Sequence, residues 1–422
     1  MLSRKAGLMA AFALWTFALG VILARPGLVV AAVPVALYLA FALQSRPPHA
    51  KVELSRTLPG GQVHEGEPAT VSLSVRNDGP RVNLEVVDVI PEGVEVSKGS
   101  NHLFATLEAG QSRSFTYTVV TPNFGGYAFG PLKVRTSDGG ATRYEAKTIR
   151  SSETLRVYPE VKYLKRVELR QTRPRGWPGE TVTRRAGQGM EFYEIRGRAQ
   201  GEALRRVNWR ATARAGDYML NRYMNEAGGE TVLILDTRDV SRVGVPPEST
   251  VSYSVRAAAA LSYRLLRDRN RVGLLNVGRQ LVRIPPGFGR RQFDRILAGL
   301  TSTEEAADDW NIDLVPHYVS LYFSRMVQVV LISPLVDWGP SHVVYDLVRR
   351  GYDVSVVSPS PVVLDRGAGG DLRTQKLARD IASLDREQRL SILRKRARVV
   401  DWDPAVPLED ALVRLEEPWK RG

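Results

Sequence analysis

Val232-Leu-Ile-Leu-Asp236, followed by the turn Thr237-Arg238-Asp239, is the stretch that decides how the second half of this 422-residue chain folds. Its four consecutive apolar residues predict a strand that is buried on both faces. Similar short apolar runs follow at Val272–Val277, Val327–Ser333, Val354–Val357 and Val399–Trp402. Helical patterns separate them, at Val251–Arg269, Arg290–Leu300, Ile312–Ser324, Ser341–Arg350, Leu372–Arg396 and Leu408–Leu415. This alternation predicts a largely parallel, Rossmann-like α/β sheet with helices on both faces.

The turn after the first strand does not fit the common nucleotide-binding motifs. A dinucleotide fold needs glycines at this turn, and no Walker lysine motif occurs anywhere in the chain. Cysteine is absent, which excludes disulfides, thiolate catalysis and Cys-ligated metals. The five histidines lie far apart in the sequence, without ligand spacing. We therefore predict no catalytic residue and no cofactor.

The formal net charge of +14 raises the question of a polyanionic partner. The basic residues are spread along the chain, and no nucleic-acid-binding motif accompanies them. We expect no nucleic acid as a partner, and contact with anionic lipid headgroups is the simpler interpretation of the charge.

Upstream of the α/β region lies a basic segment, Val161–Arg185, in which arginine and lysine alternate with proline and glycine. This composition predicts a loop rather than a helix or a strand. A denser group of distinctive residues follows it: Gly189, Glu191, Phe192, Arg196, Gly201, Arg206, Trp209, Ala213 and Arg214.

The three arginines of this group, with Glu191 and Trp209, are expected to form a buried ion-pair network that clamps the segment onto the α/β domain. The alternative is an exposed Glu191/Arg196/Arg206/Arg214 cluster that serves an enzyme or binds an anion or a lipid headgroup. An enzyme would need a second acid, a base or a metal beside Glu191, and none is apparent.

Residues 50–159 are typical of an all-β sandwich. Thr70–Arg76, Asn83–Val89, Ser114–Val120 and Leu132–Arg135 alternate apolar and polar side chains, and turn residues separate them. Short strands at regular intervals are the pattern of two packed antiparallel sheets.

The N-terminus carries two uncharged apolar runs, Ala6–Ala24 and Gly27–Leu43, separated by Arg25-Pro26-Gly27. Each approaches the roughly 20 residues that cross a bilayer. A secretory signal peptide is the competing interpretation of the first run, and the second run weakens it. More basic residues flank the pair than lie in its turn, so the positive-inside rule places both termini and the soluble domains in the cytoplasm of a multi-pass membrane protein.

The group from Gly189 to Arg214 resembles the signature of the domain-of-unknown-function 58 (DUF58) family, in which Gly-x-Glu-Phe leads to Arg, Gly-Asp, Arg, Ile-Asp-Trp and Ala-Arg. The chain departs from it at Gly197-Arg198, Glu202 and Asn208. The order of parts also agrees: a membrane anchor (1–45), a β-sandwich (50–159), a connector with the signature (160–230) and an α/β domain (231–422).

Asp236 at the end of the first strand also resembles a von Willebrand factor A domain, where Asp-x-Ser-x-Ser holds a divalent cation through oxygen ligands. Here Arg238 and Val240 occupy the two serine positions, and Ser333-Pro334 stands where a second aspartate is common. An arginine repels a metal and can itself neutralise Asp236. We therefore expect a degenerate site at Asp236, Arg238 and Val240 without a metal.

The resemblance implies a membrane-anchored, non-enzymatic interaction or scaffold protein, since such family members are commonly encoded with MoxR-type AAA+ ATPases. A protein of that kind is the expected partner. It would dock at the carboxyl edge of the sheet, where the candidate contacts are Asp236, Arg238, Asp239, Ser333 and Asp337.

Overall fold

The computed structural model describes residues 4–44, 51–137, 144–165, 177–197, 207–301, 309–364 and 372–413, without the side chains of 42–44, 177–194, 222–228, 372 and 413. The chain divides into two compact units, Met1–Tyr158 and Pro159–Gly422, and each is described by itself. The coarse prediction is confirmed: an apolar N-terminal helix precedes a β region and an α/β region.

The N-terminal apolar runs form two helices, α1 (Arg4–Ile22) and α2 (Pro26–Gln44). After α1, Ala24 takes a left-handed conformation with φ 51°, and the Arg25 N–H donates to the Gly20 carbonyl at 2.9 Å. A Cβ on Gly20 would lie 2.8 Å from Val29, so glycine permits this close approach of the helices. Within the described residues, α1 is the one helix long and apolar enough to cross a membrane by itself, a test that a signal sequence also passes.

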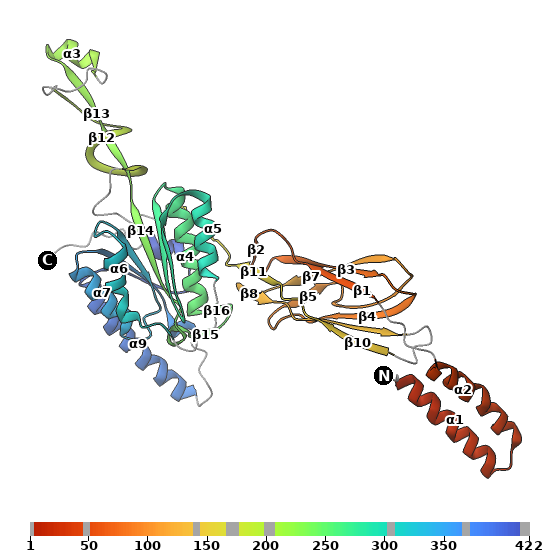
Figure 1. Cartoon of the computed structure of the whole chain (residues 1–422). Coiled ribbons are helices and arrows are strands. Elements are labelled where there is room, and N and C mark those ends of the chain that lie inside the picture. The colour runs from red at the N-terminus through yellow and green to blue at the C-terminus, as the bar shows by residue number, and fades with distance from the viewer. Residues whose placement is uncertain are drawn as a thin grey trace. The chain divides into compact units, whose positions relative to one another are not determined.

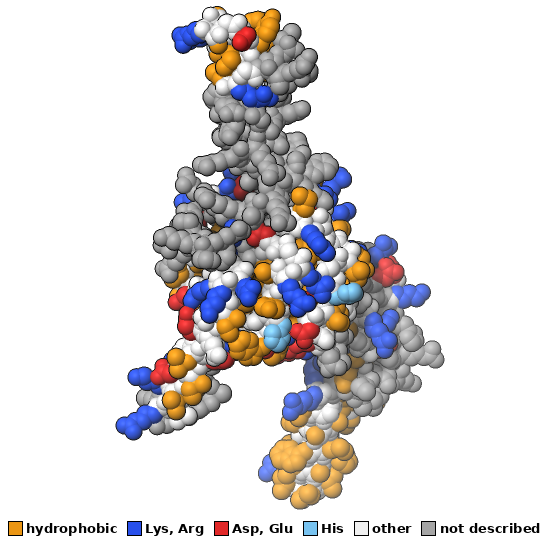
Figure 2. Space-filling model, turned by 90° about the vertical axis from the view of Figure 1, so that its left-hand side faces the viewer, with side chains coloured by type: hydrophobic (Ala, Val, Ile, Leu, Met, Phe, Trp, Pro, Cys, Tyr) orange, Lys and Arg blue, Asp and Glu red, His pale blue; other side chains and the backbone are white. Residues whose placement is uncertain are grey.

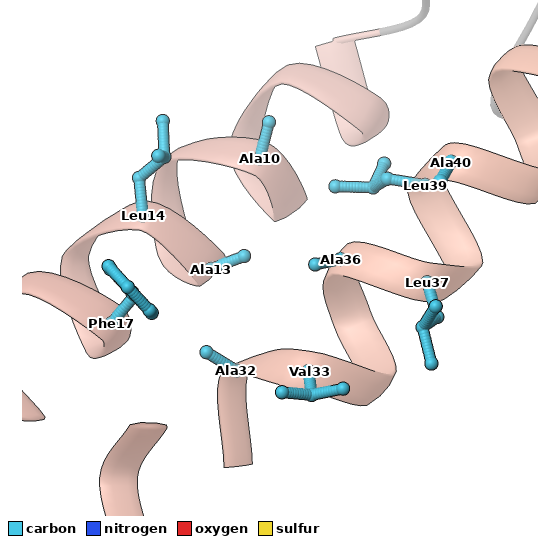
Figure 3. A pocket seen from close by; sticks show the side chains of 10 residues that line it. All are labelled: Ala10, Ala13, Leu14, Phe17, Ala32, Val33, Ala36, Leu37, Leu39 and Ala40. Carbon is cyan, nitrogen blue, oxygen red and sulfur yellow. The ribbon is translucent and has the colours of Figure 1, made fainter. Parts of the chain in front are cut away.

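A groove runs between α1 and α2, and it is lined by alanine, leucine, valine and phenylalanine alone. Ala13 of α1 and Ala36 of α2 point toward one another across it (Figure 3). A groove without polar groups lacks the convergent donors and acceptors that orient a specific ligand. We interpret it as the packing seam of the two helices.

The β region contains two four-stranded antiparallel sheets whose inner faces share hydrophobic clusters. In one sheet the order is β1 (Val52–Thr57), β3 (Pro68–Asn77), β7 (Ser112–Val120) and β5 (Glu95–Lys98). In the other it is β10 (Tyr144–Ile149), β9 (Leu132–Ser137), β4 (Val82–Asp88) and β6 (His102–Leu107). A small third sheet joins β2 (Val63–His64), β11 (Thr154–Tyr158) and β8 (Gly125–Ala128). Strict alternation of buried and less buried residues along β4 explains why this period was readable from the sequence.

A charged cluster that no sequence pattern indicated lies inside the β region. The side chains of Arg56 and Asp88 are fully buried, and their N–O distance is 2.7 Å. Asp88 also accepts a hydrogen bond from the Tyr117 hydroxyl at 2.6 Å, and Arg56 lies over the Phe129 ring and pairs with Glu153. Burial and the contact with Asp88 raise the pKa of the Tyr117 hydroxyl well above its ordinary value. The cluster joins strands of both sheets.

The prediction of a basic loop over Val161–Arg185 is wrong from Trp177 onward. There the chain forms a long strand, β12 (Trp177–Gly197), paired antiparallel with β13 (Met219–Gly228) in a two-stranded ribbon. Four register irregularities interrupt the pairing. The sequence of this strand is rich in arginine and glycine and shows no apolar alternation that would have predicted it.

The second unit is built on a six-stranded sheet in the order β18-β17-β14-β19-β20-β21. The strands are β14 (Glu230–Asp236), β17 (Arg271–Val277), β18 (Leu281–Gly287), β19 (Gln328–Ile332), β20 (Asp353–Pro359) and β21 (Arg398–Trp402). All pairs are parallel except β17–β18, so β18 is an antiparallel edge strand. The order reverses between β14 and β19, since β17 lies on one side of β14 and the later strands lie on the other.

Helices cover both faces of this sheet (Figure 1). They are α4 (Thr250–Arg267) and α5 (Gly289–Leu300) on one face, and α6 (Val315–Tyr322), α7 (Gly339–Arg349) and α9 (Leu372–Arg394) on the other. Shorter elements are α3 (Trp209–Ala215), α8 (Pro361–Leu364), α10 (Leu408–Val413), the 3-10 turns η2 (Asp239–Ser241) and η3 (Ile312–Leu314), and the pair β15 (Gly244–Val245) and β16 (Glu248–Ser249). Both faces of β14 are buried, as predicted: Ile234 packs in the cluster under α7 and α9, and Leu233 is also fully buried.

Candidate functional site: a buried arginine at the sheet edge

The candidate site lies at the carboxyl edge of the sheet, where the strand order reverses. Asp236 is the last residue of β14, and Ser333 directly follows β19, its neighbour in the sheet. Open α/β sheets bind their ligands at this reversal, because the loops from adjacent strands diverge there. The topology therefore brings together the two positions that the sequence placed 97 residues apart.

Arg238 occupies the centre of this edge and bridges two aspartates. Its Nε and Nη2 donate to the two carboxylate oxygens of Asp236 at 2.9 and 3.1 Å. Its Nη1 and Nη2 donate to Asp337 at 3.1 and 2.8 Å. Paired N–H donors that match a carboxylate are the geometry in which arginine binds most strongly.

Asp236 has no lone pair left for a metal. Its Oδ2 accepts from Arg238 and from the hydroxyls of Ser241 and Ser333, both at 2.8 Å, and its Oδ1 accepts from the side chain and the backbone N–H of Arg238. The Asp236 side chain is fully buried, and that of Arg238 is 7% exposed. The guanidinium thus supplies the positive charge at this carboxylate, and Val240, at the second degenerate position, is largely exposed.

The charges of the cluster reinforce one another. Burial alone would lower the pKa of the Arg238 guanidinium, but its hydrogen bonds to Asp337 and Asp236 and their negative charges raise it above its ordinary value. Burial alone would raise the pKa of Asp337, and the contacts with Arg238 hold it below its ordinary value. The arginine is therefore charged at any pH at which the fold persists.

The loop that carries Asp337 is held from the other side by α9. Arg386 donates to the Pro334 carbonyl at 2.8 Å, and Arg389 donates to the carbonyls of Leu335 and Val336. Leu335 has the left-handed φ of 56°, a conformation that costs a non-glycine residue about 1 kcal/mol or more. The loop is thus fixed by two arginines of α9, and nothing in a helical sequence pattern reveals which arginines turn inward.

The five predicted contact residues divide by exposure. Asp236, Ser333 and Arg238, three of the candidate contacts, are buried, which leaves them out of reach of a direct partner contact. Asp337 and Asp239 reach the surface, with side chains 34% and 49% exposed. Asp239 pairs with Arg279 at 2.7 Å and with Arg242 at 3.7 Å, so the accessible part of the edge carries aspartates with two partly exposed arginines beside them.

The signature residues do not form a buried clamp where the structure describes them. Trp209 is 68% exposed at the start of α3, and Arg214 is exposed in the same helix, which buries none of its residues. Asn208 caps this helix by accepting from the Ala211 N–H at 3.0 Å, which is one role for the polar residue before the tryptophan. Arg196 is half-buried and donates to the neighbouring Gly197 carbonyl. Gly201 and Arg206 lie outside the described residues, as do the side chains of Glu191 and Phe192; Gly189 lies in β12.

Over the described ranges of the chain, no group of three or more histidine, cysteine, aspartate or glutamate side chains has an arrangement that could hold a metal ion. Asp239, Asp337 and Asp236 each accept hydrogen bonds from an arginine, and Asp309 accepts one from the Asp239 backbone N–H at 2.8 Å. In the described structure, the chemistry of the edge is ion pairing.

The family model described as "Protein of unknown function DUF58" matches residues 194–357, a range that contains the whole Arg238 cluster. The resemblance inferred from the signature is therefore confirmed over these residues. No curated protein sequence matches the chain.

Solved structures show only weak similarity. The ASH/PapD-like domain 7 of human CEP192 is 16% identical with a TM-score of 0.21, over 28% of this chain and 91% of that one. A FixG-related protein from Vibrio parahaemolyticus is 10% identical with a TM-score of 0.19, over 25% and 95%. The CARDB domain of a Pyrococcus furiosus protein is 11% identical with a TM-score of 0.16, over 24% and 87%. Scores this low carry no argument about function.

Proposed function

We propose, for a chain whose residues 194–357 carry the DUF58 sequence, a membrane-anchored and non-enzymatic interaction protein. Its α/β unit resembles a von Willebrand factor A domain in the aspartate that ends its first strand. It docks a protein partner at the carboxyl edge of the sheet. The partner is a MoxR-type AAA+ ATPase, the protein that the family resemblance implies.

The observation that carries this proposal is the Asp236–Arg238–Asp337 cluster. A cation site at this edge would offer an open coordination position to a partner's carboxylate. Here the positive charge is built into the chain, and hydrogen-bond donors occupy both carboxylate oxygens of Asp236. A rigid, ion-paired edge suits recognition better than catalysis. Asp239, Val240, Asp337 and the 40% exposed Trp338 are the accessible contacts.

The anchor and the compartment complete the proposal. In it, α1 and α2 cross the membrane as a hairpin, and the positive-inside bias of their flanks leaves both termini and the two soluble regions in the cytoplasm. An ATPase of the cytosol would then reach the sheet edge directly.

The test is direct binding between the full chain in detergent and the purified MoxR-type ATPase of the same organism, with and without ATP. We expect Asp239→Lys to weaken binding at least tenfold, because it reverses an exposed charge on the edge. The matched control is Asp346→Lys on α7, an aspartate of similar exposure (39%) that also pairs with an arginine.

Two results would contradict the proposal. Absence of binding by the unaltered chain in every nucleotide state removes the ATPase as the partner. Equal binding by the Asp239→Lys and Asp346→Lys variants places the contact away from the carboxyl edge.

A further inference from the structure

Helix α9 has two halves with different surroundings. From Asp385 onward its inner side packs against the sheet, where Leu390 and Leu393 are buried in the core. Residues 373–384 are exposed, apart from the half-buried Gln375. Figure 1 shows this end of α9 leading away from the neighbouring helices, and Figure 2 shows apolar side chains on the projecting segment. An unsupported helix of about 12 residues is marginal in water, so this half has the form of an element that a partner covers.

An apolar stripe runs along the solvent side of α9. Its members are Leu377, Ile381, Leu384 and Ile392, whose side chains are 61%, 59%, 72% and 43% exposed. Gln388 fills the remaining step, so the intervals along the stripe are four, three, four and four residues. At about 100° per residue, this stripe lies opposite Leu390 and Leu393, and core packing does not explain it.

The stripe is one residue wide. A helix that lies in a membrane surface presents a broad apolar face, commonly with aromatic residues. Alternating steps of three and four residues instead form the narrow seam of a two-helix contact. The shape of the stripe therefore favours a partner helix over a lipid surface.

The charges along the border of the seam indicate which helix fits. Three acids flank it, Asp380, Asp385 and Glu387, against two arginines, Arg373 and Arg394. The side chains of Asp385 and Glu387 remain 46% and 60% exposed, although each pairs with an arginine of the same helix. Two parallel copies of this seam would bring Asp380 of one next to Asp385 of the other, because bordering residues of paired helices face each other. Like charges at such positions oppose self-association.

We propose that the α9 seam (Leu377, Ile381, Leu384 and Ile392) docks an amphipathic helix of a partner protein whose apolar stripe is bordered by lysine and arginine. The proposal stands on the geometry of α9 and holds whichever protein binds the sheet edge. The packed half of α9 also holds the Asp337 loop through Arg386 and Arg389. A helix bound along α9 is therefore linked through these two arginines to the loop that contacts Arg238.

The test uses the full chain in nanodiscs of zwitterionic lipid. The probe is a fluorescent synthetic helix of about three heptads, with leucine along one seam and lysine on its borders. A second probe has glutamate on the borders and the same leucines. We expect the lysine probe to bind at least tenfold more tightly than the glutamate probe, measured by fluorescence anisotropy.

Three variants locate the binding. The combined change Leu377→Ser/Ile381→Ser/Leu384→Ser is expected to weaken binding of the lysine probe at least tenfold, because it removes apolar side chains of the seam and leaves the core unchanged. Leu321→Ser, at a 63% exposed leucine of α6, is the matched control and leaves binding unchanged. Asp380→Lys/Glu387→Lys keeps the apolar seam, and we expect this variant to bind the glutamate probe more tightly than the lysine probe. Such a reversal shows that the variant is folded, which a simple loss of binding would not show.

Two outcomes overturn the proposal. Equal binding of both probes, or equal binding by the serine variant, shows that α9 does not select a basic helix. The absence of cysteine from the chain permits a second check, in which Ile381→Cys is the sole thiol. Efficient disulfide dimers of that variant would assign the seam to a second copy of this chain, and a stronger response to empty anionic nanodiscs than to the lysine probe would assign it to lipid.

Discussion

At the scale of single residues, Asp236 shows how one neighbour changes the chemistry of a carboxylate. An aspartate at the end of the first strand of a parallel sheet is suited to hold a cation. The guanidinium of Arg238, two positions later, supplies a positive charge at this carboxylate and also binds Asp337. Removing one partner of a buried ion pair leaves the other charge unpaired, at a cost of about 3–5 kcal/mol. The charges of Asp236 and Arg238 therefore depend on each other.

Arg238→Ser should therefore recreate a cation site. The substitution vacates the space between Asp236, Ser333 and Asp337 and adds a hydroxyl, so that hard oxygen ligands surround it. We expect Mn²⁺ to raise the thermal midpoint of this variant by several degrees through preferential binding to the folded state. Arg238→Met, which fills the space without oxygen, should not respond. An equal Mn²⁺ effect on the unaltered chain would contradict this account.

Asp337 should make the stability of the α/β unit depend on pH in the acid range. Its folded-state pKa is held below its ordinary value near 3.8, so the Arg238 contact stabilises the fold fully above about pH 4. That contribution is lost as the pH falls through the folded-state pKa. Urea unfolding of the Asp337→Asn variant between pH 2.5 and 5 should show a shallower pH slope than the unaltered chain. Parallel slopes would rule out this linkage.

In the β region, Arg56 should be far more important to stability than its surface counterparts. Arg56→Ala leaves Asp88 buried and unpaired, which should lower the free energy of unfolding by about 3–5 kcal/mol. Arg135→Ala is the control, since Arg135 pairs with Glu85 at 3.3 Å with a side chain 56% exposed, and such pairs contribute about 1 kcal/mol or less. Denaturant titration of the detergent-solubilised chain measures the free energy of unfolding of both variants. Similar losses in the two would contradict the view that burial makes the Arg56 pair the more important one.

At the scale of elements, the start of α7 positions Asp337 by close packing. A Cβ on Gly339, the first residue of α7, would lie 2.7 Å from Ile312 and 3.1 Å from the Asp337 carboxylate. Glycine is therefore required for η3 and the Asp337 loop to approach each other. The same loop receives the donors of Arg386 and Arg389, so α7 and α9 together define its shape.

Gly339→Ala should displace the Asp337 loop and lengthen its contact with Arg238. We expect a destabilisation of about 1–3 kcal/mol from the steric conflict. Gly60→Ala is the control, because a Cβ there meets nothing within 4 Å. Thermal unfolding compares the two, and a Gly339→Ala variant as stable as the control would show that the loop adapts freely.

At the scale of the whole molecule, the proposed hairpin anchor makes a prediction about topology. A single cysteine at position 60 in the β region and another at 269 in the α/β region should both react with a membrane-impermeant maleimide only after the cells are opened. Retention of the sequence before Ala24 in the mature protein, read by N-terminal mass spectrometry, distinguishes an anchor from a cleaved signal sequence. Labelling of either cysteine in intact cells would overturn the cytoplasmic assignment.

The sequence by itself determined the features that repeat along the chain. The apolar helices, the alternating strands of the β region and the buried strands of the sheet were predictable, because burial imposes a period on neighbouring residues. The first part of β12 was mispredicted as a loop, because its sequence, rich in arginine and glycine, shows no such period.

Only the tertiary structure decided which distant side chains meet. The burial of Asp236 and Arg238, the bridge to Asp337 and the inward-facing Arg386 and Arg389 depend on strand order and helix packing, which bring residues about 50 to 100 positions apart into contact. The exposure of Trp209, against the expected clamp, was likewise decided by packing. A charged residue has the same letter whether it faces water or a buried carboxylate, and its role follows from the neighbours that the fold supplies.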